Sequence, residues 1–165
     1  MLTEPKVEYR EEQPYAAIRT KVAMQSIPKE LPPLIFQVSE WVENNKLEEA
    51  GPAFFRYLSM DRGTMDVEVG VPLKQKPQGD GKVIGGSFPA GKYLTARHTG
   101  PYTELPKSHM SMDKYAQEHQ LKQGTIKGEN GQTWGTRAEF YVTHPEEEKD
   151  QSKWVTDLAL YLADN

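Results

Sequence analysis

Residues 135–142, Gly-Thr-Arg-Ala-Glu-Phe-Tyr-Val, contain a carboxylate and a phenol at a spacing that could do chemistry. On a strand, Glu139 and Tyr141 would share one face with Arg137. The other face would be an ordinary core face, made of Ala138, Phe140 and Val142. The polar face is either a solvated surface or the floor of a pocket. In a pocket, an aromatic-lined carboxylate would suit an organic cation, through Coulomb attraction and a cation–π contact of about 0.5–2 kcal/mol. The same carboxylate could act as a general base for water, or as an acid that opens a strained ring.

Three further residues could belong to such a pocket. Glu68 lies in the alternating stretch 65–72 and is either a pocket residue or a half-exposed strand residue. Tyr102 follows a Gly-Pro turn, and it either projects into the pocket or anchors the turn. Trp134 lies in a Gly-rich stretch that we expect to be a loop, where it either caps the pocket or fills a local gap.

Several kinds of site are disfavoured by the sequence. The chain has no cysteine, which excludes disulfides, thiolate catalysis and cysteine-based zinc sites. None of the four histidines is spaced with a carboxylate as a metal-binding pair, so we expect no metal. The stretches 85–86 and 128–131 lack the Lys and the following helix of a phosphate-binding loop. We therefore predict that the protein uses no cofactor.

Composition limits the possible partners. A chain of 165 residues, with 36% hydrophobic and 27% charged residues, fits one folded soluble domain. Its net charge of −4, without a cluster of Lys and Arg, argues against nucleic-acid binding. There is no signal peptide and no apolar run of the roughly 20 residues that a membrane span needs. We expect a cytoplasmic protein that does not bind membranes.

Periodicity predicts the elements that would position these residues. Amphipathic helices are expected over residues 31–42 and 105–116, the second with Thr103 as N-cap and Pro106 in its first turn. The stretch 74–82 is a linker candidate, and 145–150 a charged turn. Strands are expected over 5–10, 15–22, 53–60, 65–72, 92–98, 135–142 and 154–162.

The same pattern occurs twice. Tyr15 lies 78 positions before Tyr93, Trp41 lies 74 before Tyr115, and Gly51 lies 84 before Gly135. We predict one domain, 1–165, with a first repeat over about 5–73 and a second over about 82–163. The fold class is α+β: duplicated strand–helix–strand–strand units around a pseudo-twofold axis, with antiparallel sheets, two helices and a central ligand cleft where the copies meet.

The repeat also relates the candidate site residues to one another. At an offset of 84, Phe55 corresponds to Glu139 and Tyr57 corresponds to Tyr141. One pocket would then hold three aromatic rings and a single carboxylate.

Five short motifs stand out along the chain. They are Gly51-Pro52 before an aromatic strand, Asp66-Val67-Glu68-Val69-Gly70, Phe88-Pro89-Ala90-Gly91-Lys92-Tyr93, His98-Thr99-Gly100-Pro101-Tyr102 with Leu105, and Glu139-Phe140-Tyr141. In this order and spacing, they resemble the GyrI-like small-molecule-binding domain family. This family shares the SOUL/GyrI-like fold with the effector-binding domains of multidrug-sensing transcription activators. The resemblance implies a duplicated fold whose central cleft takes bulky, often cationic or aromatic compounds, with a buried Glu at the position of Glu139.

We therefore expect that the protein binds a bulky hydrophobic, aromatic or cationic small molecule. By binding it, the protein would sequester a drug or toxin. Some standalone members of the family hydrolyse cyclopropane-containing DNA-alkylating toxins, which makes such a hydrolase the alternative, with Glu139 as acid or base and Tyr141 orienting water or substrate. Interaction with DNA gyrase, known for other members, has no local motif in its favour here. No DNA-binding region flanks the domain, which disfavours a transcription factor. The expected ligand-binding set is Phe55, Tyr57, Glu68, Tyr102, Trp134, Glu139 and Tyr141.

Overall fold

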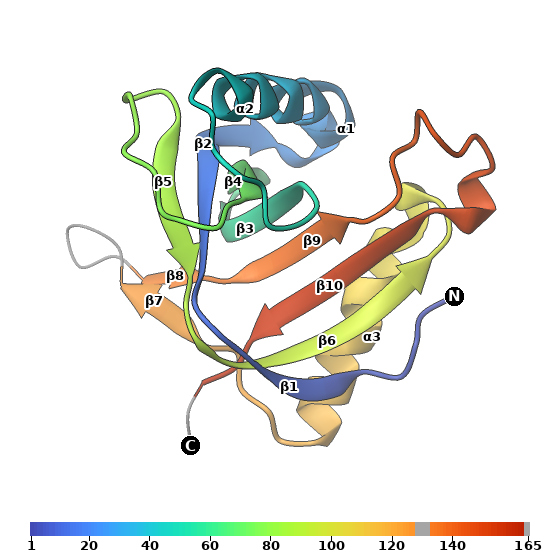
Figure 1. Cartoon of the computed structure of the whole chain (residues 1–165). Helices are drawn as coiled ribbons and strands as arrows, with labels where there is room; N and C mark the ends of the chain where they lie inside the picture. Colours follow the sequence, from blue (N-terminus) through green and yellow to red (C-terminus); the bar gives the residue numbers. More distant parts are fainter. Residues whose placement is uncertain (128–132, 164–165) are drawn as a thin grey trace. The chain divides into compact units, whose positions relative to one another are not determined.

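In the computed structural model, residues 1–127 and 133–163 are described, and they form antiparallel strands with a few helices (Figure 1). The chain divides into two compact units, one formed by Glu11–Ala90 and the other by Met1–Arg10 together with Gly91–Asn165. The predicted mixture of helices and antiparallel strands is confirmed. None of the described helices is long and apolar enough to cross a membrane.

The unit Glu11–Ala90, here the first unit, packs a helix on a four-stranded sheet. Its strands are β2 (Gln13–Ala23), β3 (Phe54–Asp61), β4 (Thr64–Pro72) and β5 (Ile84–Phe88), in the spatial order β3-β4-β2-β5. A single-turn helix α1 (Ile27–Glu30) leads into α2 (Pro32–Asn44), whose first turn accommodates the prolines. Val38 and Val42 of α2 are buried against Ala16, Ile18 and Val71 of the sheet.

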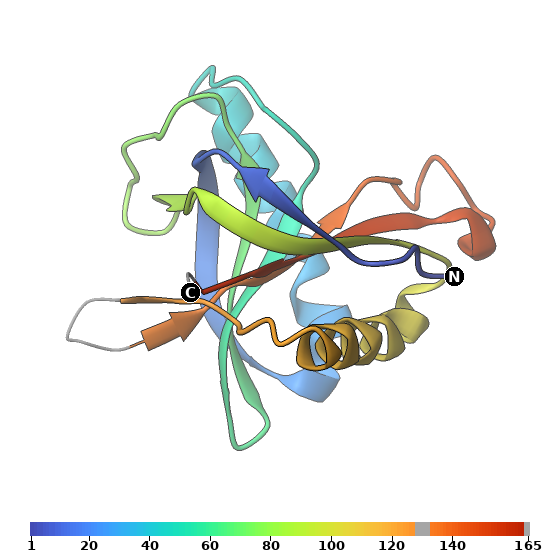
Figure 2. The same cartoon turned by 90° about the horizontal axis from the view of Figure 1, so that it is seen from below.

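The second unit has a similar plan. Its strands β1 (Lys6–Arg10), β6 (Gly91–Thr99), β9 (Arg137–Tyr141) and β10 (Val155–Tyr161) have the order β1-β6-β10-β9. Helix α3 (Leu105–Glu118) runs along one face of this sheet (Figure 2). Its residues Met112 and Ala116 pack against Leu94, Ala96 and Leu158. A short hairpin pairs β7 (Thr125–Lys127) with β8 (Thr133–Gly135).

The two units share some local features of the backbone. Each helix is followed by a non-glycine residue with positive φ, Lys46 at 56° and Gln120 at 58°. In the first sheet, Phe55 of β3 lies opposite Val69 of β4. In the second, Glu139 of β9 lies opposite Leu158 of β10. The β7–β8 hairpin follows α3, and no hairpin of described residues stands at the corresponding place after α2.

The edge strands β1 and β5 do not pair with the strands that are next to them in sequence. β1 precedes the first unit but pairs with β6, with Lys6 opposite Thr95. β5 directly precedes β6 but pairs with β2, with Gly86 opposite Tyr15.

Most predicted elements are confirmed, and three details are wrong. Thr103 is no N-cap, because Tyr102–Glu104 form a 3-10 turn and α3 begins at Leu105 without a side-chain cap. Trp134 lies in strand β8 rather than in a loop. Val142 is exposed rather than in the core, because β9 ends at Tyr141. The sequence patterns also missed α1, β5 and the β7–β8 hairpin.

Candidate functional site

Glu139 lies on the helix-covered face of the second sheet. Its partner on β10 is Leu158, which lies opposite Ala96 of β6. Both of these residues belong to the core beneath α3, so strand alternation directs Glu139 and Tyr141 toward α3 as well. The polar face of β9 is therefore not a solvated surface, and Glu139 is buried.

Two donors hold the Glu139 carboxylate. The Tyr141 hydroxyl donates to Oε1 at 2.6 Å. Nε2 of His109, on α3, lies 2.7 Å from Oε2. A buried carboxylate needs such donors, because burial without them would strongly disfavour its charge. His109 was not predicted as a site residue. Its carboxylate partner lies thirty positions away in sequence, and the spacing of the histidines was interpreted only in terms of metal binding.

The hydrogen-bonded network extends outward from His109. Nη1 of Arg137 lies 3.5 Å from Nδ1 of His109. The same guanidinium donates to Asp113 of α3 from both of its terminal nitrogens, with Nη1 3.2 Å from Oδ2. The fork shape of Arg makes this a directional contact. Arg137 therefore links the imidazole to a carboxylate near the surface.

Aromatic rings lie beside the carboxylate. The Tyr102 ring is 5.4 Å from that of Tyr141 and 4.6 Å from that of Trp154, measured between centroids. Burial raises the pKa of the Tyr102 hydroxyl, and the negative charge of Glu139 raises it further. The charge of Glu139 thus acts on the Tyr102 hydroxyl, and the rings of Tyr102, Tyr141 and Trp154 form one aromatic cluster next to the carboxylate.

A buried histidine fixes the turn before Tyr102. Nε2 of His98 lies 3.2 Å from the carbonyl oxygen of Pro101, and its Nδ1 lies 2.7 Å from the Ser108 hydroxyl on α3. The turn is thereby tied to the helix that also carries His109.

The structure brings three of the seven predicted ligand-binding residues together in the second unit: Tyr102, Glu139 and Tyr141. Trp134 pairs through its backbone with Ile126, and its side chain lies outside the described part of the structure. Phe55, Tyr57 and Glu68 belong to the first unit.

Glu68 does not share a sheet face with Phe55 and Tyr57. It lies directly opposite Arg56, whose side chain is only 2% exposed, and the two form an ion pair of 3.5 Å. The Tyr15 hydroxyl donates to Glu68 at 2.5 Å and accepts from Arg56. Burial raises the pKa of Tyr15, which stays protonated. Because neighbouring residues alternate, Phe55 and Tyr57 lie on the other face, toward α2.

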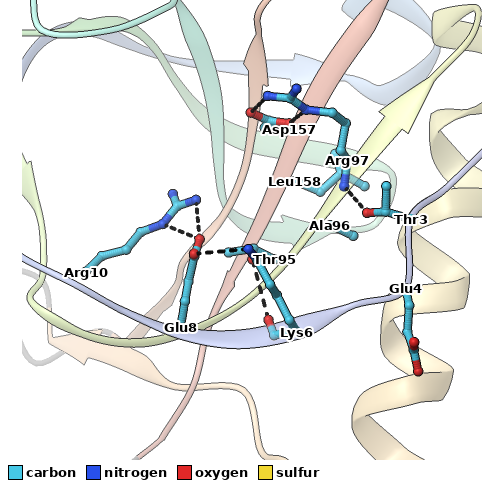
Figure 3. Close-up of a pocket in the computed structure, with 10 residues that line it drawn as sticks. All are labelled: Thr3, Glu4, Lys6, Glu8, Arg10, Thr95, Ala96, Arg97, Asp157 and Leu158. Carbon is cyan, nitrogen blue, oxygen red and sulfur yellow. Dashed lines mark hydrogen bonds and ion pairs between the residues drawn. The ribbon is translucent and has the colours of Figure 1, made fainter.

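A pocket of about 370 Å³ lies on the face of the second sheet opposite Glu139 (Figure 3). Charged side chains dominate it, and they pair with one another: Arg10 donates to Glu8 at 2.9 Å, and Arg97 to Asp157 at 2.8 Å. Its size fits a small molecule, but small-molecule sites are mostly apolar. None of the predicted site residues lines this pocket. Among the described residues, no group of three or more His, Asp or Glu side chains could hold a metal ion.

Comparison with known proteins places this geometry in a family. A family model described as the GyrI-like small molecule binding domain matches residues 3–162. A search of curated proteins found no match.

Solved structures of three proteins share the fold. The C-terminal domain of EcmrR has a TM-score of 0.75 at 20% identity, covering 98% of each chain. In the EcmrR–DNA complex, this chain spans only 58% of the EcmrR chain. SAV2435, solved bound to tetraphenylphosphonium, has a TM-score of 0.66 at 10% identity, covering 98% of this chain and 94% of its own. A hydrolase encoded by lin2189 from Listeria innocua has a TM-score of 0.62 at 15% identity, covering 97% and 92%. At these identities the structures establish the fold alone, whereas the family model, matched over nearly the whole chain, shows that this chain belongs to the GyrI-like small molecule binding domain family.

Proposed function

We propose that this protein binds bulky organic cations, with the Glu139 carboxylate as counter-charge and aromatic rings as the contact surface. The observation that carries the proposal is the buried Glu139, held by His109 and Tyr141 beside the rings of Tyr102 and Trp154. Both hydrogen bonds come from groups that carry no charge when His109 is neutral. They stabilise the carboxylate without cancelling its charge, which is then available to a cation.

The electrostatic gain can be bounded. For a cation about 5 Å from the carboxylate, at an effective dielectric constant of about 20, the attraction is about 3 kcal/mol. Cation–π contacts add about 0.5–2 kcal/mol. These values correspond to a preference of roughly a hundredfold or more for a cation over a neutral compound of the same shape.

The remaining members of the predicted site stay part of the proposal. Phe55, Tyr57 and Trp134 stay in the proposed set on the sequence argument alone. Glu68 has the weakest support, because Tyr15 and Arg56 already occupy its carboxylate. The internal duplication and the cytoplasmic location predicted from the sequence also remain proposals, the former supported by the matching backbones of the two units.

Titration with tetraphenylphosphonium tests the proposal, since SAV2435 was solved with that compound. Isothermal calorimetry would compare wild type with Glu139→Gln, which keeps the shape and removes the charge. We expect a loss of affinity of roughly a hundredfold, because the variant removes an attraction of about 3 kcal/mol. Glu146→Gln, the same charge change in an exposed turn, is the matched control and should bind like wild type. Equal affinity of wild type and Glu139→Gln would exclude Glu139 from the site.

Hydrolysis of a strained ring is the second candidate, and one contact favours it. The carboxylate of Glu139 is hydrogen-bonded to an imidazole, so the pair could accept a proton from water and return one to a carbon. The water oxygen would bond to one ring carbon, the strained carbon–carbon bond would break, and the other carbon would take the proton. Incubation with a cyclopropane-containing alkylating compound, followed by mass spectrometry, tests this: the product must gain the mass of one water. An unchanged compound after long incubation would rule the reaction out. Gyrase inhibition stays a prediction that a supercoiling assay would test.

A further inference from the structure

Four polar side chains form one continuous path from the surface of the second unit to its buried carboxylate. Asp113 contacts Arg137, Arg137 contacts His109, and His109 contacts Glu139. Their side-chain exposures fall along this path, from 54% to 21%, 16% and 7%. Two of them come from α3 and two from β9, so the path links the helix to the strand.

The first unit provides an internal comparison. The two helices align at their ends, where the turn N–H of Asn45 bonds to Trp41 and that of His119 bonds to Tyr115. Counting from these ends and from the strand registers gives an equivalent for each residue of the path. The equivalents of Asp113, Arg137, His109 and Glu139 are Ser39, Ala53, Ile35 and Phe55.

None of these four equivalents carries a charge, although the helix ends and the strand registers used for the alignment match. The fold therefore does not need a charged residue at any of these positions. In the second unit the four polar side chains occur together, and each contacts the next one along the path. This is the pattern expected of residues that act jointly on a ligand, rather than of residues that support the fold.

The geometry assigns the proton of neutral His109. Nε2 lies 2.7 Å from a carboxylate oxygen and therefore carries the hydrogen, because a carboxylate can only accept. Nδ1 faces a guanidinium nitrogen at 3.5 Å, which can only donate, so Nδ1 presents its lone pair. Asp113 holds that guanidinium in place. Arg137 and Asp113 thereby favour the tautomer that donates to Glu139.

We propose that His109 determines the charge selectivity of the site, an inference that rests on the proposed binding of cations at Glu139. When neutral, His109 holds the carboxylate by a hydrogen bond and leaves its negative charge to the ligand. When protonated, it forms an ion pair with Glu139. A cationic ligand then lies next to a pair of side chains that carries no net charge. His109 is a positioning residue in the first state and a competing cation in the second.

The charged and titratable groups around His109 define what its protonation does. Glu139, Arg137 and Tyr141 face it from β9, and Asp113 lies on its own helix. An imidazolium at this position would form an ion pair with Glu139, and the Arg137 guanidinium at Nδ1 would repel it. An imidazolium and a bound cation about 7 Å apart, at an effective dielectric constant of about 20, repel one another enough to weaken binding by roughly fiftyfold.

The experiment measures tetraphenylphosphonium affinity at about pH 7.5 and about pH 5.5, a range in which imidazoles ordinarily titrate. The charge of this probe does not change with pH. Wild type should lose about tenfold to fiftyfold in affinity at the lower pH. His109→Gln, whose side chain can donate to Glu139 but cannot become charged, should keep nearly constant affinity. His119→Gln is the matched control, directly after the same helix. Its imidazole stacks on Tyr115 and bonds to the carbonyl oxygen of that residue, and this variant should behave like wild type.

Two outcomes would overturn the inference while leaving the proposed function intact. One is a wild-type affinity that does not change with pH, and the other is a His109→Gln affinity that falls as steeply as that of wild type. The proposed function itself fails if Glu139→Gln binds as well as wild type at neutral pH. A measurement without ligand keeps the inference testable in that case. The ¹⁵N chemical shifts of the His109 ring should show a protonated Nε2 and an unprotonated Nδ1, and the reverse would refute the inference.

Discussion

The ion pair between Arg56 and Glu68 offers the sharpest test of how this fold tolerates buried charge. We predict that Arg56→Met strongly destabilises the protein. Both side chains are nearly inaccessible, and their charged groups are 3.5 Å apart. At an effective dielectric constant of about 20, that separation gives an attraction of about 5 kcal/mol. Loss of the partner would leave Glu68 charged in a buried position, for which the usual cost is about 3–5 kcal/mol.

The surroundings of Arg56 add smaller contributions. Its guanidinium carbon lies 4.9 Å from the Phe88 ring centroid, and Nη1 is 3.2 Å from the Ser87 carbonyl oxygen. Met fills similar volume and keeps part of the packing on Phe88. We therefore expect the change in unfolding free energy to lie near 3–5 kcal/mol rather than above it.

Urea denaturation followed by circular dichroism measures this change. Arg97→Met is the matched control, because Arg97 and Asp157 form a bidentate pair that is half exposed, and such pairs contribute at most about 1 kcal/mol. In the double variant Arg56→Met with Glu68→Gln, the loss should be at least about 2 kcal/mol smaller than the sum of the single losses. A loss below about 1 kcal/mol for Arg56→Met, or additivity in the double variant, would refute the reasoning.

Two further predictions concern the core and the alkaline limit. Met112→Ala, in the core beneath α3, should lower the free energy of unfolding, measured by urea denaturation, by about 2–5 kcal/mol. Met110→Ala, on the exposed side of the same helix, should lower it by less than about 0.5 kcal/mol. Similar losses in the two variants would contradict the packing described. The raised pKa of Tyr15 keeps it protonated in the folded protein, while the unfolded chain ionises above the ordinary value of 10.0, so stability is fully present below that pH and falls above it. Removing this residue with Tyr15→Phe should reduce the alkaline slope by up to about 1.4 kcal/mol per pH unit, and an unchanged slope would show that Tyr15 ionises in the folded state.

Local periodicity was sufficient to place Glu139 and Tyr141 on one face of a strand, and the structure adds that this face is covered by α3. His109 was not predictable in the same way, because it lies thirty positions from Glu139 in sequence. Only the packing of α3 on β9 brings the two together. The signal in the sequence was its position: His109 stands between Leu105 and Met112 on the side of the helix that is buried.

The separation of Glu68 from Tyr57 has a specific cause. Counting back from the turn that joins β3 and β4 would place Tyr57 opposite Glu68, on one face. A β-bulge between Tyr57 and Ser59 shifts the register by one residue, so that Arg56 lies opposite Glu68 instead. A shift by one residue turns every following side chain to the other face. Bulges leave little trace in a single sequence, so the sequence alone could not show that Glu68 lies on the opposite face from Phe55 and Tyr57.

The pairing of β1 with the distant strand β6 has a consequence for how the chain folds during its synthesis. The first unit is complete once β5 has been synthesised, since all of its strands lie within Glu11–Ala90. The second unit needs β1, which emerges first of all strands, and its partner β6 follows only about 85 residues later. Contacts over such sequence distances form slowly, and an unpaired strand can meet wrong partners in the meantime. Lys6, Glu8 and Arg10 alternate along this strand and place charges on it while it is still unpaired. Charged edge strands resist pairing with other chains.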